Sequence, residues 1–387
     1  MRLAEQLGVV VIALACAHDA RAEGSALTAR ASTEVAGYSD TDHVNVITPS
    51  IKGHVENPTA GWAVDGGYLV DVISAASVDI VSTASRRWEE VRQGGNLGAS
   101  YKRGDWGVAA QGSLSTEPDY FSYALGGYVT RDFDERNLSL IAGYGFGHDL
   151  IGREGTPFSV YSHSFDHHVL TFGITKVLDR ATTLALTADV KFQEGDSSKP
   201  YRYIPLFSAE TAASVPAGAS LATVNRLRLA PSLIEALPLS RNRYALTARL
   251  SHRFAHSLTR LESMAYDDAW DVKAFMANGR HLFYLAPRWS VGPHARYYVQ
   301  SAANFWKLAY VGSATSVPTF RTGDRELGPL MNVTGGASAR WAVGPRARID
   351  AWTLGANFDV TYTWFFDDLY IKRRLSQLIA LSLEAAW

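Results

Sequence analysis

Apolar and polar residues alternate with a period of two along much of the chain, most clearly over residues 352–366. In this segment apolar or aromatic residues occupy every second position, and Thr, Gly, Asn and Asp fill the positions between them. Successive side chains of a strand point to opposite faces, so the pattern predicts a strand with one apolar and one polar face. The same alternation recurs at 27–35, 62–72, 183–192, 244–251 and 332–341, which predicts an all-β chain.

Polar segments separate these strands and differ in length. Short turns are predicted at 103–105, 134–137, 179–180, 240–242 and 344–345, and longer loops at 195–221 and 306–325. Short turns at one end and long loops at the other are typical of membrane barrels. We therefore predict a transmembrane antiparallel up-and-down β-barrel of about 14–16 strands. A soluble β-sandwich or soluble barrel would share the alternation and stays open at this point.

The N-terminal segment resembles a secretory signal. Arg2 precedes an apolar run at 7–17, and Ala20-Arg21-Ala22 forms an A-x-A cleavage site. We expect residues 1–22 to be a cleaved signal peptide and 23–387 to form the barrel. The alternatives are a buried N-terminal helix and lipidation at Cys16, although the residues before Cys16 make a poor lipidation signal. Export and a barrel together predict the outer membrane of a Gram-negative bacterium.

The last residues of the chain alternate as well. Ile379, Leu381, Leu383, Ala385 and Trp387 fall on one face, and the chain ends on the aromatic residue. This resembles the terminal signal that the barrel assembly machinery reads in outer-membrane proteins. We therefore predict that Trp387 is the assembly signal, with the assembly machinery and the outer-membrane lipid bilayer as partners.

Composition and charge narrow the function classes. The chain has 37 basic and 38 acidic residues, a net charge of −1, which gives no indication of a nucleic-acid partner. Its 10 Trp, 18 Tyr and 16 Phe suit the aromatic girdles of a membrane barrel.

The predicted inward faces carry charges of both signs. Glu34, Asp65 and Asp71 lie in the N-terminal half, and Arg249, Arg296 and Arg340 lie in the C-terminal half. We predict that these six residues line the lumen and bind passing solutes, with the two sets on opposite walls. Since neither sign dominates, strong ion selectivity is not expected. Alternatively, the two sets pair with one another inside a closed interior.

Two groups of histidine and acidic residues are candidates for a chemical site. In a strand, His163 and His167 would share one face while Asp166 and His168 share the other, so no metal site is predicted there. Asp40, Asp42 and His43 are interpreted as rim charges, and no G-x-S-x-G motif is present. We therefore predict no catalytic residue, no metal and no cofactor.

The segment 71–85 loses the alternation and is rich in small and hydroxyl residues. It is interpreted as a bulged strand and loop. The alternatives are an inward constriction and a Ca²⁺ site made by carboxylate and hydroxyl oxygens.

Several segments resemble the bacterial family of domain of unknown function 3570 (DUF3570). The resemblance rests on residues 38–43 and 48–50, 71–79 and 82–85, 200–202, 237–238 and 240–243, and on Arg-Tyr-Tyr-Val-Gln-Ser-Ala-Ala-Asn-Phe at 296–305. It implies an outer-membrane barrel of this size and no particular activity. Family members are often encoded beside a small lipoprotein, a thioredoxin-like protein and a flavin transferase, which implies a periplasmic or lipoprotein partner.

Three functions are compatible with these features. The favoured hypothesis is a pore or export conduit for small polar solutes. The alternative is a plugged barrel that serves as an envelope anchor or binding scaffold, and the second alternative is a barrel enzyme. Single-channel conductance separates the first two, because a plugged barrel conducts little.

Overall fold

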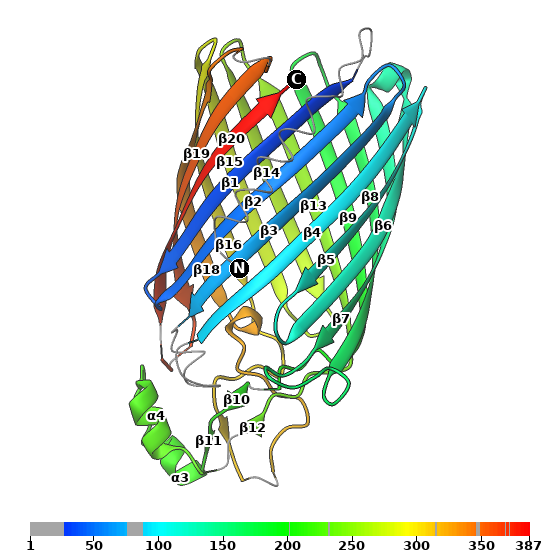
Figure 1. Cartoon of the computed structure of the whole chain (residues 1–387). Coiled ribbons are helices and arrows are strands. Elements are labelled where there is room, and N and C mark those ends of the chain that lie inside the picture. Colours follow the sequence, from blue (N-terminus) through cyan, green and yellow to red (C-terminus); the bar gives the residue numbers. More distant parts are fainter. Residues whose placement is uncertain are drawn as a thin grey trace.

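The computed structural model describes residues 27–75, 88–200, 202–230, 233–313, 316–345, 349–367, 369–370 and 372–387. Sixteen strands of this part of the chain form one closed barrel of strongly tilted strands (Figure 1). The strands are β1 (Thr28–Asp40), β2 (Val44–Asn57), β3 (Trp62–Ala75), β4 (Trp88–Arg103), β5 (Trp106–Thr116), β6 (Tyr120–Phe133), β7 (Leu138–Ile151), β8 (His163–Val177), β9 (Thr182–Gly195), β13 (Ser240–Arg253), β14 (Ser257–Asp268), β15 (Lys273–Ala286), β16 (Trp289–Gln300), β18 (Leu330–Ala342), β19 (Ala351–Phe365) and β20 (Arg373–Ala386).

Each of these strands is antiparallel to its two neighbours, and β1 pairs with β20 to close the ring. The predicted up-and-down barrel is therefore confirmed, with a strand number at the upper end of the expected range. The predicted signal peptide, residues 1–22, lies outside the described residues.

The outer face of the barrel is apolar. Val35, Val64, Leu250 and Phe358 all project outward and are exposed, as expected of side chains that contact lipid. Such a surface would be unfavourable in water, because it is far larger than the apolar patches of soluble proteins. The alternation predicted for residues 352–366 is thus confirmed, with Phe358 on the outer face and 45% exposed.

Aromatic residues mark both borders of this apolar band. Toward one end, a row across β6 to β9 contains Leu125, Phe146, His168 and Phe192, and the next row outward is Tyr123, His148, Asp166 and Glu194. Toward the other end, the rings of Trp289 and Trp341 stack with centroids 5.4 Å apart. From the first of these rows to the next, aromatic side chains are replaced by charged ones. The water interface therefore lies between the two rows.

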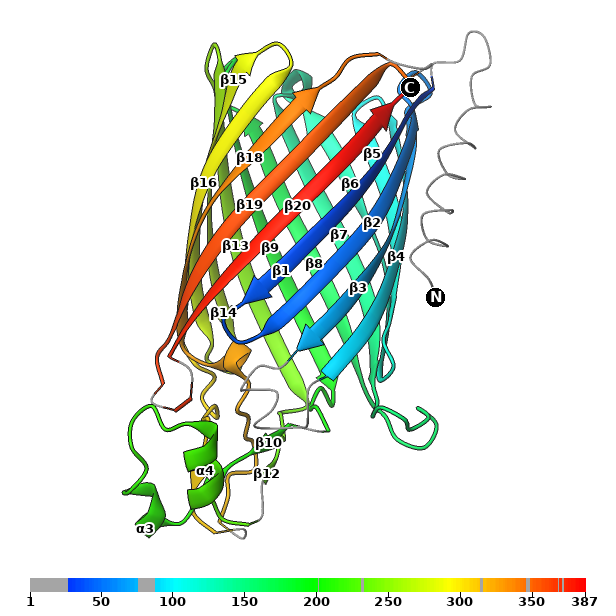
Figure 2. The same cartoon turned by 60° about the vertical axis from the view of Figure 1, so that its left-hand side comes forward.

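Short turns and long loops lie at opposite ends of the barrel. Turns at 104–105, 134–137 and 178–181 share one end with the C-terminus, and the segments 196–239 and 301–329 lie at the other (Figures 1 and 2). Because membrane barrels keep short turns on the periplasmic side, the long segments are extracellular. The turn predicted at 240–242 is wrong: these residues begin β13, since their ladder to β9 starts at Ser240–Glu194. Both loops are longer than predicted.

Two of the extracellular hairpins use the same turn. Asp40 Oδ1 accepts hydrogen bonds from the amides of Asp42 and Val44, and Tyr38 donates its hydroxyl to Asp40 Oδ2. In the β14–β15 turn, Asp268 accepts in the same way from Trp270, Val272 and Tyr266. The third residue after each aspartate has a positive φ, 64° at His43 and 66° at Asp271. The charged Asp40 is therefore part of a turn structure.

Helices contribute little to the fold. The described helices include α3 (Ala209–Ala212) and α4 (Leu221–Leu227) in the long extracellular segment. Among the described residues, none of the helices is long and apolar enough to cross a bilayer.

The C-terminal strand completes the barrel. Its ladder with β1 runs from the Arg30–Ala386 pair to the Asp40–Ser376 pair. Trp387 continues the pairing, since its amide donates to the Ala29 carbonyl at 2.9 Å and its carbonyl accepts from the Ala29 amide at 3.2 Å. Ile379, Leu381 and Leu383 are exposed on the outer face, as the terminal alternation predicted.

The facing of β19 leads to a first prediction. Phe358→Arg should destabilise the barrel by about 2–4 kcal/mol, because it places a guanidinium against the hydrocarbon core. Asn357→Arg is the matched control, because Asn357 faces the lumen on the adjacent position of the same strand. Unfolding titrations in lipid vesicles measure both changes, and equal destabilisation would contradict the assignment of the two faces.

A second prediction concerns Trp387, whose role in assembly rests on its terminal position. Deletion of Trp387 should lower the amount of folded protein in the outer membrane and leave unfolded chain in the periplasm. Fractionation with heat-modifiability on gels measures this, and Trp387→Phe, which keeps an aromatic terminus, should restore assembly. Wild-type levels after the deletion would rule out the assembly role.

Candidate functional site in the barrel lumen

The six residues predicted to line the lumen all lie in barrel strands and share its inner face. Each has an exposed outer-face residue next to it in the sequence. These neighbours are Val35 for Glu34, Val64 for Asp65, Val72 for Asp71, Leu250 for Arg249, Tyr297 for Arg296 and Trp341 for Arg340. Since adjacent side chains of a strand point to opposite sides, all six side chains point inward.

Their contacts are local rather than across the lumen. Arg249 pairs with Glu262 on β14, with Nε 2.6 Å from Oε2. Asp71 accepts a hydrogen bond of 2.5 Å from Thr48 and lies 3.6 Å from Arg92 on β4. The alternative hypothesis is that the acidic and the basic set pair with one another. In the contacts of Arg249 and Asp71, the partners are other residues on neighbouring strands.

The two sets are only partly on opposite walls. Six strands, β4 to β9, separate Asp65 and Asp71 on β3 from Arg249 on β13. Only β19 and β20 separate Arg340 on β18 from Glu34 on β1, so this pair belongs to one side of the ring. The prediction of opposite walls is therefore wrong for Arg340 and Glu34, because closure through β20 brings the two ends of the chain together.

The charge pattern becomes clearer once the other inward positions are included. The wall from β9 to β16 carries Lys191, Arg243, Arg260, Arg280 and Arg296 in addition to the ion-paired Arg249, with Asp189 and Glu262 among them. The wall from β1 to β7 carries Glu34, Asp65, Asp71, Glu90 and Asp149, with Lys52, Arg92 and Lys102 among them. One side of the lumen is thus mainly basic and the other mainly acidic.

Three arginines of the basic wall lie close together on adjacent strands. Arg260 on β14 and Arg280 on β15 are directly opposite in the strand register, and Arg296 occupies the neighbouring row on β16. All three are exposed toward the lumen, and within the described chain none has a carboxylate within ion-pair distance. Directly opposed like charges destabilise a sheet unless solvent or a counter-ion screens them.

Sequence reasoning missed Arg260 and Arg280. Both belong to strands outside the segments of clear alternation, although the register places their sequence neighbours Leu261 and Gly279, which pair with each other, on the outward face. The sequence could therefore predict that the two side chains point inward. That Arg260 lies directly opposite Arg280 depends on the register between β14 and β15.

Several histidines form separate pairs with acids. His148 lies 2.6 Å from Asp166 on the outer face, and His167 lies 3.5 Å from Asp149 inside. β8 begins at His163, which confirms that the histidine cluster is divided between two faces. On the inner wall, His294 reaches Asp359 at 3.1 Å across β18, because Gly336 between them has no side chain. Among the described residues, no Ser or Thr hydroxyl is hydrogen-bonded to the imidazole of any of these pairs.

The segment 71–85 is described only in part. Residues 71–75 continue β3 as a regular strand paired with β4, and Asp71 faces the lumen there. The remaining residues, from 76, lie outside the described residues.

The extracellular segments fold into a cap at one mouth of the barrel. β10 (Tyr203–Ile204) pairs with β12 (Leu233–Ile234), and β11 (Leu206–Phe207) pairs with β17 (Tyr310–Val311) from the second segment. Ile204, Leu206, Leu233 and Tyr310 form its apolar core. Burial raises the pKa of the Tyr310 phenol to about 12, which keeps its hydroxyl protonated and able to donate to the Phe305 carbonyl.

A buried ion pair network holds the two segments of the cap together. Arg202 contacts Glu235 at 3.3 Å and also contacts Asp324 in the other segment. The side chain of Glu235 is fully buried and additionally accepts from Thr322 at 2.5 Å. A buried carboxylate without these donors would be strongly unfavourable, so the network favours one arrangement of the cap.

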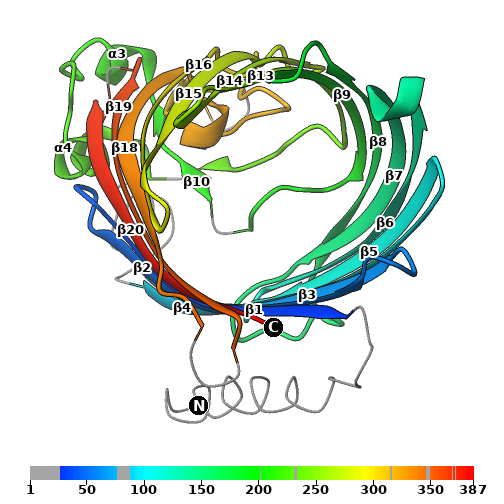
Figure 3. The same cartoon turned by 90° about the horizontal axis from the view of Figure 1, so that it is seen from above.

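The cap is attached to the inner wall beside the basic side of the lumen. Gln300 at the end of β16 donates to the carbonyls of Glu326 and Gly328, which fixes η3 (Arg325–Leu327) inside the ring near β13 to β16 (Figure 3). Between this segment and the wall is a cavity of about 560 Å³, lined in part by Arg241, Arg243 and Tyr266. The mouth is therefore narrowed on its basic side.

Comparisons with solved structures identify the fold class. CdiB from Acinetobacter baumannii aligns over 93% of this chain with a TM-score of 0.51 at 9% identity, and the chain spans 60% of that protein. A bacterial polysaccharide outer membrane secretin aligns over 91% of this chain and 97% of its own, with a TM-score of 0.43 at 8% identity. At these identities the similarity to CdiB shows the fold alone. The alignment with CdiB therefore agrees with the closed antiparallel barrel described above.

Sequence comparison agrees with the resemblance noted above. A search of curated proteins found no match to this sequence. The model of the family described as "Protein of unknown function (DUF3570)" matches residues 82–362, so the motifs at 38–50 and 71–79 lie outside the matched part. Because this match covers well over half of the chain, the protein belongs to the DUF3570 family.

Proposed function

We propose that this barrel is a passive pore or export conduit for small polar solutes. The observation that carries the proposal is the group of lumen arginines, Arg260, Arg280 and Arg296, which project into the lumen without an acidic partner in the described chain. In a dry, closed interior such charges would be paired, because an unpaired buried charge is strongly unfavourable. Their exposure is consistent with a lumen that contains water and mobile ions.

The distribution of charge supports a preference among solutes. Basic residues on β9 to β16 face mainly acidic residues on β1 to β7, which creates a field across the lumen. Such a field orients polar solutes without excluding either sign. The unpaired arginines add a local positive potential, so anions should be favoured modestly over cations.

The plugged barrel is the second candidate, and the extracellular cap favours it. The cap has its own apolar core, and η3 is fixed inside the ring by Gln300. A rigid cap of this kind could present a binding surface to a periplasmic, lipoprotein or extracellular partner. The two candidates differ in conductance, because only an open lumen passes ions.

A third prediction tests the pore directly. The double change Arg260→Ser and Arg280→Ser should leave a conducting pore but shift its ion preference toward cations, because it removes two unpaired positive charges. Reversal potentials in a KCl gradient across planar bilayers measure the shift. The matched control is Arg260→Lys with Arg280→Lys, which keeps both charges and should behave like the wild type. Absence of conductance from the purified wild type would end the pore proposal.

A fourth prediction concerns the cap. Arg202→Met leaves Glu235 buried without its cation and should destabilise the packing of the cap by about 3–5 kcal/mol. We expect faster proteolysis within 196–239 while the barrel keeps its heat-modifiable migration on gels. Arg226→Met on the exposed face of α4 is the control. If the cap restricts the lumen, Arg202→Met also raises conductance. An unchanged rate of proteolysis would show that the ion pair network does not hold the cap.

A further inference from the structure

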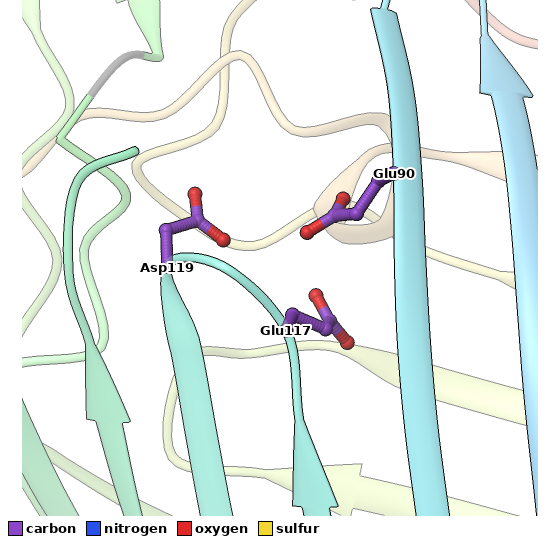
Figure 4. Close-up of side chains that lie close together, drawn as sticks. All are labelled: Glu90, Glu117 and Asp119. Atoms are coloured by element: carbon purple, nitrogen blue, oxygen red, sulfur yellow. The ribbon is translucent and has the colours of Figure 1, made fainter. Parts of the chain in front are cut away.

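Three acidic side chains converge at the extracellular mouth, outside the basic wall described above. Glu90 is near the extracellular end of β4, and Glu117 and Asp119 flank Pro118 in the turn between β5 and β6. One carboxylate oxygen from each residue lies within 4.8 Å of those of the other two. Figure 4 shows the Glu90 carboxylate pointing from β4 toward the other two carboxylates.

Two members of the cluster are buried, and one oxygen of Glu90 lacks a hydrogen-bond donor within the described residues. Glu90 is 5% exposed and Asp119 is 6% exposed. Glu90 Oε1 is shielded from solvent and has no hydrogen-bond donor within the described residues. A buried carboxylate oxygen in this state is costly, because it has lost water without gaining another donor.

The cations around the cluster do not neutralise it. Arg92 lies 3.7 Å from Glu117, but it also lies 3.6 Å from Asp71 and is therefore shared. The charge of Lys199 acts on Asp119 and is opposed by that of Glu154. Burial raises the pKa of the Asp119 carboxyl, which reflects the cost of placing its charge there.

This arrangement matches the requirements of a hard divalent cation. Calcium binds carboxylate and carbonyl oxygens at about 2.3–2.6 Å, so two of its ligands can be up to about 5 Å apart. We propose that Glu90, Glu117 and Asp119 bind a Ca²⁺ ion at the extracellular mouth, with water or backbone oxygens completing its coordination. Mg²⁺ suits the cluster less well, because it demands shorter bonds and a near-ideal octahedron.

Binding there would join separate parts of the mouth. The ion would link β4 to the β5–β6 turn, whose shape is set by the hydrogen bond from the Glu117 amide to the Tyr120 carbonyl at 2.7 Å. The Asp119 carbonyl accepts from the Gly152 amide at 2.6 Å, which extends the link to the β7–β8 loop. The inference does not depend on the lumen being a pore.

Calcium titration of the purified barrel in detergent, after removal of divalent ions with EDTA, tests the site. Isothermal titration calorimetry with CaCl₂ should show one saturable site, and MgCl₂ should bind more weakly. Glu90→Gln and Asp119→Asn should each weaken Ca²⁺ binding by at least about tenfold, since each removes a charged ligand. Glu210→Gln, which removes an exposed acid of α3 outside the cluster, is the control and should leave the affinity unchanged.

Thermal unfolding gives a second test, because acidic residues that bind no ion would show no change of unfolding temperature with Ca²⁺. Ca²⁺ should raise the unfolding temperature of the wild type, because the ion binds only the folded state. Glu90→Gln should abolish the effect of Ca²⁺, because it removes the buried carboxylate ligand on β4. If Glu90→Gln does not fold, Glu117→Gln in the turn carries the same test. A wild type without a saturable Ca²⁺ signal, or variants that bind like the wild type, would overturn the proposal.

Discussion

The hydrogen-bonded seam between β1 and β20 is the interaction on which the rest of this structure depends. An open sheet in a bilayer would leave two strand edges without partners, and each unsatisfied backbone group in hydrocarbon costs several kcal/mol. The seam removes both edges, from the Arg30–Ala386 pair to the Asp40–Ser376 pair, and Trp387 extends it by two further backbone hydrogen bonds. Closure therefore makes the first and last strands neighbours.

Closure also determines which face of the barrel carries the charged side chains. Once the sheet is a ring, every strand has one lipid face and one lumen face, and the outer face is occupied by residues such as Val35, Leu250 and Phe358. Charged residues within the apolar band are consequently confined to the lumen, where they either pair locally, as Arg249 does with Glu262, or remain in contact with solvent, as Arg260 and Arg280 do. The lumen chemistry follows from closure and from the alternation together.

The two mouths of the barrel differ because their connections differ in length. Periplasmic turns such as 104–105 are too short to fold on themselves, whereas the extracellular segments bury an apolar core around Ile204 and Tyr310. The cap is positioned by contacts at barrel strand ends, notably Gln300 with the carbonyls on either side of Leu327. The acidic cluster lies at the same end, where strand ends and turns can approach one another without lipid contact.

The sequence by itself determined the class of the fold and the facing of individual residues. The period of two at 352–366 and the terminal set ending at Trp387 were enough, because a strand's side chains alternate regardless of what it pairs with. For the same reason, Glu34, Asp65 and Arg296 were placed on the inner face correctly. The turn predicted at 240–242 failed because Ser, Arg and Asn are common in turns, and only pairing with β9 shows that they begin a strand.

Only the tertiary structure decided which residues meet. Register sets Arg260 against Arg280, and ring closure puts Arg340 on the same side as Glu34, although the two are far apart in the chain. Glu90, Glu117 and Asp119 carry no local motif, and their convergence depends on how β4 pairs with β5 and how β5 turns into β6. Alternation is a property of each strand alone, whereas register and closure are properties of the whole ring, so proximity within the lumen could not be read from the pattern of residues.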